Sequence, residues 1–311
     1  MIEEDFYKHL EEKLHILEAE RRRIISWLLG FVFILVVLSL PLLYYIYTHY
    51  GENAFYVTLA LALAIPVLFY FERRKAWSKL FKREFFILLL RAFFPNLTYR
   101  AEQYIPVELF VGSMLFIDKP RPDRYTGEDF VEGKVGDTDI AFSEVHAEYK
   151  TETIDMKGRK RTNWHTIFKG VLFMAKFPKR AKGVVLVYPD TFRLFGTPAG
   201  LERVKLEDPE FEKRFDVFSN DQIEARYILS LSLMRRMLDF ILKTGAKVRF
   251  SFMDEYMFCA MDFGKDFFEA PSIFHSLYPL IYKEGFKQYV QEVELLISVV
   301  EELKLNQRIW L

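Results

Sequence analysis

The sequence predicts an α+β protein, in which a two-helix transmembrane hairpin is followed by a cytosolic domain with an antiparallel sheet and flanking helices. Two uncharged apolar runs, 24–47 and 54–71, predict the hairpin because a helix needs about 20 apolar residues to cross a bilayer. From residue 130 the apolar residues alternate, which predicts strands. No helical pattern separates the first of these strands, so we expect an antiparallel meander.

Residues 1–23 are predicted to form an N-terminal cytosolic amphipathic helix. Apolar residues recur at steps of four, four, four and three on this charged segment: Ile2, Phe6, Leu10, Leu14 and Leu17. Such a stripe packs against the protein's own domain or against a second copy in a homo-oligomer. The absence of three clear heptads favours packing against its own protein.

The region 24–71 is predicted to be the membrane anchor. Its connector, 48–53, is long enough only for a tight turn between antiparallel helices. Neither apolar run contains an ionisable residue, so an ion or proton pathway would lack the groups that it needs. A helical hairpin buried inside a soluble protein is the alternative.

Basic residues predict the orientation of the hairpin. Lys and Arg bias a loop toward the cytoplasm, and they occur on both outer flanks of the hairpin but not in the connector. We therefore expect a multi-pass protein of the cytoplasmic (inner) membrane with both termini in the cytoplasm. The lipid bilayer is its first expected partner, since flanking cations attract anionic head groups. The predicted membrane-interface residues are Arg21, Arg22, Arg23, Arg73, Arg74, Lys75, Lys79, Lys82 and Arg83.

Residues 72–311 are predicted to form the cytosolic domain. Before the sheet we expect a helix over 77–94 that Pro95 ends, short helices over 98–103 and 106–113, a strand over 114–117 and a loop over 118–129. The sheet begins with strands over 130–135, 139–153, 164–177 and 183–188. The later elements are strands over 203–206 and 215–218, a helix begun by Asp221 and Glu224 as a capping box, a helix over 233–243 between Ser232 and Gly245, a hairpin of 248–252 and 256–263 about Asp254 and Glu255, and a helix over 282–303.

Composition and missing motifs exclude several classes of function. The single cysteine, Cys259, rules out an intramolecular disulfide and a cysteine-based metal cluster. A formal net charge of zero gives no global field that would attract nucleic acid, and no nucleic-acid partner is expected. The chain has no GxSxG, P-loop or GxGxxG signature, and we expect no cofactor.

The densest polar set lies on the strand predicted over 139–153. Alternation places Glu144, His146, Glu148 and Lys150 on one face, with Val145, Ala147 and Tyr149 on the other. His146 and Glu148, with His165 from the next strand, could act as metal ligands or as an acid–base set. The other interpretations are a ligand- or partner-binding surface and a solvated face with cross-strand ion pairs.

A second polar set lies where the next strand leaves a basic loop. Arg161, Trp164 and His165 could hold a phosphate-bearing ligand or lipid head group there, or could belong to a solvated hairpin tip. Asp208 and Glu210, together with Asp221 and Arg226, are explained by helix capping and ion pairing.

Four blocks of the sequence resemble a known family. They are DRYTGEDFVEGKVGDTDIAFSEVHAEYKT (123–151), RTNWHTIFKGVLFMAKF (161–177), VKLEDPEFEKRFDVFSNDQIEARYILS (204–230) and VVEELKLNQRIW (299–310). Together they are similar to DUF3137, a bacterial domain of unknown function, over roughly residues 70–311. Leu231 departs from the family, which usually has proline there. The resemblance implies a membrane-anchored protein, and a LemA-type membrane protein as a partner, but no activity.

We therefore expect a membrane-anchored binding, adaptor or regulatory module rather than an enzyme. Its partner would be another membrane protein or a cytosolic protein. The alternative is a metal-dependent hydrolase or other enzyme that uses His146, Glu148 and His165 on the sheet. An enzyme requires those three groups to converge in a concave pocket.

Overall fold

The computed structural model describes residues 2–154, 158–190, 197–303 and 305, and it has mixed helix and sheet. The chain forms two compact units. The hairpin unit comprises Met1–Ala92 and Glu269–Tyr289, and the sheet unit comprises Phe93–Phe268 and Val290–Leu311. The predicted domain division at residues 23 and 71 stays a prediction, because compactness does not test where a membrane begins.

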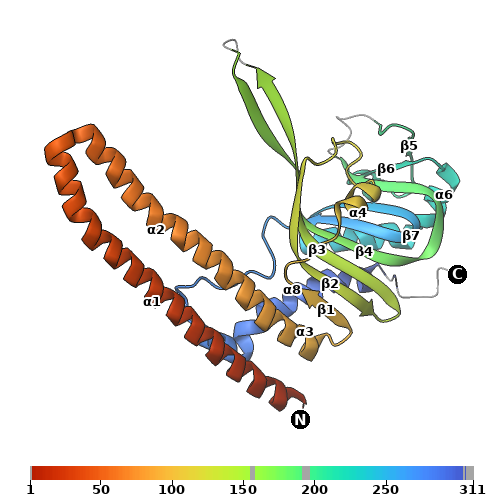
Figure 1. Cartoon of the computed structure of the whole chain (residues 1–311). Coiled ribbons are helices and arrows are strands. Elements are labelled where there is room, and N and C mark those ends of the chain that lie inside the picture. Colours follow the sequence, from red (N-terminus) through yellow and green to blue (C-terminus); the bar gives the residue numbers. More distant parts are fainter. Residues whose placement is uncertain (1, 155–157, 191–196, 304, 306–311) are drawn as a thin grey trace. The chain divides into compact units, whose positions relative to one another are not determined.

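The hairpin unit is built on two long antiparallel helices, α1 (Ile2–Tyr50) and α2 (Glu52–Phe81), which are shown in Figure 1. A π-helical turn, η1 (Lys82–Phe86), and α3 (Ile87–Phe93) continue α2. The predicted amphipathic helix and first span are thus one continuous helix. Gly51 alone separates α1 from α2, with φ 80°, a conformation that glycine adopts without a Cβ clash.

Most side chains of the two apolar runs, 24–47 and 54–71, are exposed or only partly buried. Only 6% of the most apolar stretch of the first helix is buried, and none of that of the second. By length and composition, both could cross a membrane. A hairpin buried within a soluble protein would have the opposite exposure. In contrast, the stripe on residues 1–23 is buried at Leu10, Leu14 and Leu17, whereas the side chains of Ile2 and Phe6 lie outside the described residues.

Among its described residues, the sheet unit contains seven antiparallel strands in the order β1-β2-β3-β4-β6-β5, with β7 paired to β4. The strands are β1 (Leu97–Arg100), β2 (Arg124–Val135), β3 (Thr138–Ile154), β4 (Lys160–Pro189), β5 (Glu202–Val204), β6 (Phe215–Ser219) and β7 (Lys247–Asp262). The helices are α4 (Val107–Gly112), α5 (Pro209–Glu212), α6 (Gln222–Ile228), α7 (Leu231–Thr244) and α8 (Lys283–Glu302), and α8 begins within the hairpin unit.

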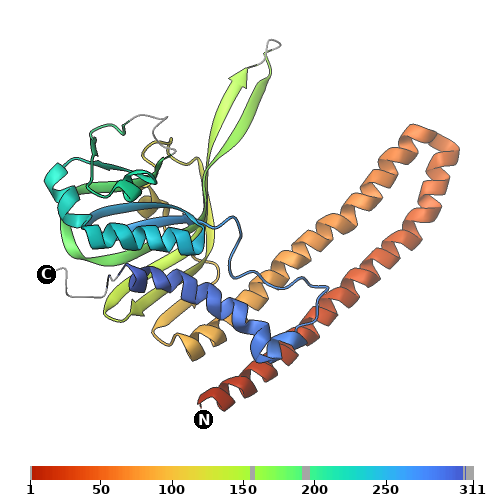
Figure 2. The ribbon, with the colours of Figure 1, turned by 180° about the vertical axis from the view of Figure 1, so that it is seen from behind.

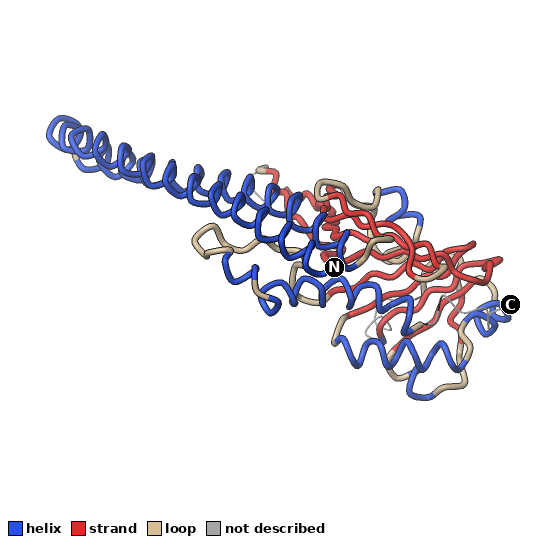
Figure 3. Tube along the Cα trace, turned by 90° about the horizontal axis from the view of Figure 1, so that it is seen from below, coloured by secondary structure: helices blue, strands red, loops and turns tan. Residues whose placement is uncertain are grey.

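Both faces of this sheet carry apolar cores. Val145, Ala147 and Leu172 pack with Phe110 of α4 on one face. On the other, the Phe142 ring stacks on Phe173 and Phe268, at 6.1 and 6.4 Å. Figure 2 shows α7 lying across one face of the sheet, and Figure 3 shows the strands, in red, gathered in one layer. Because Val145 and Ala147 are buried, the predicted register of this strand is confirmed.

Several predicted elements are wrong. The helix predicted over 98–103 is absent, because β1 pairs with β2 there. The strand predicted over 114–117 is instead a run of turns, in which Met114 has a φ of 57°. The expected strands 164–177 and 183–188 form one strand, β4, through Pro178. The expected hairpin about Asp254 is also one strand, because both halves of β7 pair with β4. Asp254 has a φ of 49° and lies where the register of this pairing shifts.

The helix caps were predicted with mixed success. Asp221 caps α6 as expected, by accepting from the backbone N–H groups of Ile223 and Glu224. Glu224 does not complete the box, because its carboxylate accepts from the backbone of Lys182. Ser230 rather than Ser232 caps α7, which begins two residues earlier than predicted, and Gly245 ends it with φ 67°.

Candidate functional site

The strands β3 and β4 extend beyond the rest of the sheet as a two-stranded arm (Figure 1). In the described pairings, residues 149–154 and 160–166 pair only with each other. β2 begins opposite Glu148, and the pairing of β7 with β4 reaches only as far as Val171, so neither strand runs alongside the arm. Residues 160–166 are all exposed. An isolated pair of strands is marginally stable in water, so contacts at the base of the arm are needed to hold it.

Asp123 and Arg124 supply those contacts. The guanidinium of Arg124 lies 3.9 Å from the centre of the Trp164 ring and donates to the Glu148 carboxylate at 3.1 Å. The Asp123 carboxylate accepts from the backbone N–H of Lys150 at 2.8 Å. An exposed cation–π contact of this kind stabilises by about 0.5–1 kcal/mol.

One face of this region carries most of the predicted polar set. Glu144, His146, Glu148 and Lys150 alternate with the buried residues as expected, and Trp164, directly opposite Lys150, shares their face. His146 Nε2 lies 3.7 Å from Glu148 Oε1.

His165 and Arg161 lie on the opposite face. His165 pairs with Tyr149, their rings stack at 5.0 Å, and its Nε2 lies 2.8 Å from Thr151 Oγ1. Arg161 pairs with Thr153. The structure therefore does not bring His165 together with His146 and Glu148. The cause is a bulge: Ala147 pairs with Phe168 but Glu148 pairs with Thr166, and the extra residue reverses the facing of every later position.

A different acidic cluster lies nearer the core. Carboxylate oxygens of Glu128, Asp129 and Glu144 lie within 4.8 Å of one another. Asp129 is buried with φ 61° and accepts from the Tyr99 hydroxyl at 2.5 Å, while Glu144 accepts from the backbone of Phe267 at 2.5 Å. Burial raises the pKa of Tyr99, and the negative charge of Asp129 raises it further. The Tyr99 hydroxyl therefore stays protonated and can donate its hydrogen bond to Asp129. Protein donors thus engage Asp129 and Glu144, and the cluster shares only Glu144 with the predicted set.

Open depressions occur on the described part of the sheet unit. One, of about 420 Å³, lies beside the base of the arm between residues 166–170 and 262–266, where Lys169 pairs with Asp266 at 2.9 Å. Another, of about 310 Å³, is lined by residues 110–122. A third, of about 980 Å³, lies between α5 and α7 and includes Asp208. Asp208 caps α5 by accepting from the backbone of Glu210 and Phe211, so the capping explanation of that segment is confirmed.

Comparison with known proteins identifies the family of this region. Residues 166–305 match the family model described as a protein of unknown function, DUF3137. This part of the chain is a DUF3137 domain. The match is shorter than the range 70–311 expected from the resemblance, and the block at 123–151 lies outside it.

The other comparisons add little. No curated protein matches the chain. The crystal structure of the mycobacterial trehalose monomycolate transport factor A aligns with 67% of this chain and 89% of its own, at 10% identity and a TM-score of 0.33. A similarity this weak carries no argument about fold or function.

The DUF3137 match includes a segment that belongs to the hairpin unit. Residues 269–282, called the strap below, contact α1 and α2 through buried polar groups. Trp77 Nε1 donates to the carbonyl oxygen of Pro271 at 2.9 Å. Lys82 Nζ lies 3.7 Å from the Glu269 carboxylate and is almost fully buried. Sequence reasoning gave no signal for these contacts, because they join segments about 190 residues apart.

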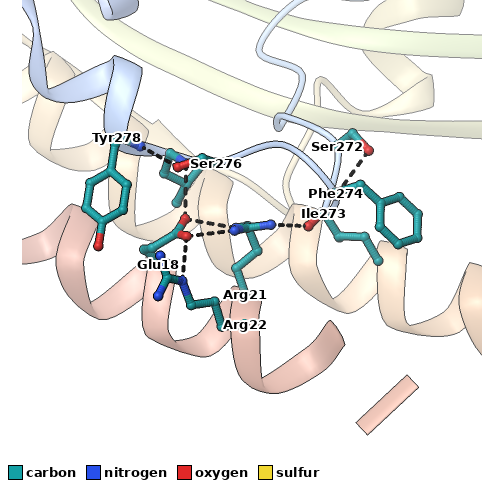
Figure 4. Close-up of polar contacts among 9 residues, drawn as sticks. Glu18, Arg21, Arg22, Ser272, Ile273, Phe274, Ser276 and Tyr278 are labelled. Carbon is teal, nitrogen blue, oxygen red and sulfur yellow. Dashed lines mark hydrogen bonds and ion pairs between the residues drawn. The ribbon is translucent and has the colours of Figure 1, made fainter. Parts of the chain in front are cut away.

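Glu18 and Arg21 form the centre of this docking (Figure 4). The Arg21 guanidinium donates to the Glu18 carboxylate at 2.6 and 2.8 Å and to the carbonyl oxygen of Ile273 at 2.6 Å. The backbone N–H of Leu277 donates to Glu18 at 3.0 Å. The hydrogen bond from Arg21 is the main reason that the pKa of Glu18 is lowered to about 2.

Two predicted membrane-interface residues therefore do not face lipid. Arg21 and Lys82 are buried and ion-paired within the hairpin unit. The remaining members of the set are exposed: Arg22, Arg23, Arg73, Arg74, Lys75, Lys79 and Arg83.

Proposed function

We propose that this chain is a membrane-anchored binding module, with the runs 24–47 and 54–71 crossing the bilayer and the arm binding a partner protein in the cytoplasm. The partner is another membrane protein or a cytosolic protein. The observation that carries the proposal is the arm itself, whose strands leave the sheet and expose both faces to solvent.

Membrane anchoring is supported by the exposure of the hairpin. Leu61, near the centre of the second run, is 60% exposed, and it is one of many large apolar side chains exposed along α1 and α2. A contiguous apolar surface of this size is costly in water and favourable in lipid. The exposed basic residues at both outer flanks support termini in the cytoplasm.

Partner binding is supported by the chemistry of the arm. Ile154 and Trp164 are 69% and 40% exposed on one face, beside the cations Lys150 and Arg124. Exposed tryptophan and arginine contribute disproportionately to protein interfaces. This face suits a partner with an apolar pocket rimmed by acidic groups.

A reporter fusion tests the orientation. A reporter that is active only outside the cytoplasm is fused to the C-terminus, and the same reporter is inserted at Gly51. We expect no signal from the C-terminal fusion and a strong signal from the insertion. The reverse pattern would overturn the orientation and leave the hairpin in place.

A matched pair of variants tests the arm. Ile154→Asp changes the arm without touching the contacts at its base, and Ile223→Asp changes a residue of α6 that is 82% exposed. A photo-crosslinking amino acid at Glu152 is activated in native membranes, and its adducts are compared. We expect a specific adduct that persists in the α6 variant and is lost in the arm variant, with thermal unfolding unchanged in both. An adduct equally strong in both variants would contradict a binding role for the arm.

A further inference from the structure

The strap extends furthest along the helices at Phe274 and then turns back. Its contacts follow in chain order: Glu269 with Lys82, Pro271 with Trp77, Phe274 with Tyr70, Leu277 with Glu18, and Tyr278 with His15. The contacts from Lys82 to Tyr70 span about 18 Å along the helix axis, at 1.5 Å per helical residue. The strap is therefore a loop with its apex at Phe274.

The apex lies level with the ends of the two apolar runs. Tyr70, whose ring stacks on Phe274 at 5.8 Å, is the last residue but one of the run 54–71. Arg21, which holds the carbonyl oxygen of Ile273, comes three residues before the run 24–47. Both helices thus enter their apolar segments where the strap turns.

The turn presents Phe274 outward on a fixed base. Phe274 is 56% exposed, whereas Ile273 and Leu277 beside it are buried. Ser272 closes the turn, because its hydroxyl accepts from the backbone of Phe274 and its carbonyl oxygen accepts from the backbone of His275 at 2.9 Å (Figure 4). An exposed phenylalanine held in this way is costly in water but suits the boundary between head groups and acyl chains.

We propose that the apex of the strap inserts Phe274 into the cytoplasmic interface of the bilayer, as a third membrane contact beside the two spans. This inference rests on the proposed membrane anchoring. The charge around the apex favours lipid as the occupant, because Arg22, Arg23, Arg73 and Arg74 are all exposed at this level and complement anionic head groups.

Spin labelling of the full chain tests the proposal. Cys259 is buried and is replaced by alanine, and single cysteines are introduced by Phe274→Cys, Leu61→Cys and Ile223→Cys. Each labelled chain is reconstituted into nanodiscs of phosphatidylethanolamine and phosphatidylglycerol. The collision rates of the label with oxygen, which concentrates in lipid, and with a water-soluble nickel chelate give its depth.

We expect the label at residue 61 to lie in the hydrocarbon, the label at 223 to lie in water, and the label at 274 to have an oxygen-to-nickel ratio several-fold above that at 223. If 61 is in lipid and 274 is as aqueous as 223, anchoring stands and the inserted apex is overturned. If 61 is also aqueous, anchoring itself fails and the inference falls with it. In the Arg22→Gln, Arg73→Gln, Arg74→Gln background the label at 274 should become shallower, and an unchanged depth would exclude the cations from the contact.

Discussion

The hairpin unit and the sheet unit use the same apolar residue types in opposite ways. Large aliphatic and aromatic side chains of α1 and α2 are exposed, whereas Phe142, Phe173, Phe240 and Phe250 of the sheet unit are fully buried. A helix satisfies its own backbone hydrogen bonds and can present apolar side chains to an apolar solvent. A strand needs neighbours for its backbone, so the sheet unit stabilises itself by pairing and burial.

Ion pairs do not follow this division. The hairpin unit buries the pair of Glu18 with Arg21 where the strap docks. The sheet unit has a pair with a buried carboxylate, Asp118 with Arg249 at 2.6 Å, and also exposed pairs such as Lys169 with Asp266. A buried pair is costly to break because either partner alone would keep an uncompensated charge. An exposed pair stabilises by about 0–1 kcal/mol. Substitutions of apolar side chains should therefore have different consequences in the two units, and the effect of breaking an ion pair should depend on its burial.

The largest effect is expected from charge placed in the second apolar run. Leu61→Arg with Leu63→Arg should oppose membrane insertion by about 5–7 kcal/mol, since arginine at the centre of a span costs about 2.5–3.5 kcal/mol. The fraction of the chain that resists alkaline extraction from membranes measures this. Ile223→Arg, at a more exposed site of the sheet unit, is the control and should not change the fraction. Equal extraction of both variants would mean that the hairpin is not a span.

A single pair of leucine truncations compares the two environments directly. Leu172→Ala removes a fully buried side chain of β4 and should lower the free energy of unfolding of the sheet unit by about 2–5 kcal/mol. Leu61→Ala removes an exposed one and should leave that unfolding unchanged. Denaturant unfolding in detergent, followed by the near-ultraviolet circular dichroism of the sheet unit, gives both values. Similar losses would show that the hairpin and the sheet share one core.

Breaking the buried pair should release the strap. Glu18→Gln leaves Arg21 buried without its counter-charge and should weaken strap docking by about 3–5 kcal/mol. The mobility of a spin label at residue 274 measures docking. Glu11→Gln is the matched control, because Glu11 is exposed and pairs with His15 at 3.8 Å on the same helix. A label equally immobile in both variants would contradict the role of the pair.

Acid should also release the strap in the unsubstituted chain. The pKa of Glu18 is about 2 in the folded state and 4.5 ordinarily. The stabilisation of strap docking by the Glu18 carboxylate is therefore fully present above pH 4.5 and is lost as the pH falls toward 2. Its size is about 3 kcal/mol, from 1.36 kcal/mol for each unit of pKa. The label at residue 274 should therefore gain mobility below pH 4.5, and Glu18→Gln should abolish the dependence.

The two units also differ in how far their sequences predict them. The hairpin follows from local rules, and Gly51 lies within the predicted connector. The face carrying Glu144, His146 and Glu148 was predicted as well, because alternation along one strand is local. The face on which His165 lies could not be predicted in this way, because it depends on a bulge near Ile167 in the partner strand. Strap docking through Glu18 joins residues about 259 apart and left no local pattern.

The smallest effect concerns a positive φ, which the hairpin unit adopts at Gly51 and the sheet unit adopts at several residues, including Asp254. The hairpin unit turns at a glycine, Gly51, but the sheet unit gives a positive φ of 49° to Asp254, which alternation predicted to be a hairpin turn. A residue with a Cβ pays about 1–2 kcal/mol in this region, and the short polar side chain of aspartate lowers that cost. Asp254→Ala should therefore destabilise the sheet unit by about 1 kcal/mol, whereas Asp254→Gly should stay within about 0.5 kcal/mol of the original chain.

Glu255→Ala is the control, since its pair with Lys176 at 3.9 Å is exposed. Denaturant midpoints of the four proteins measure this, and equal losses for alanine and glycine would show that side-chain contacts of Asp254, rather than its backbone, bend β7.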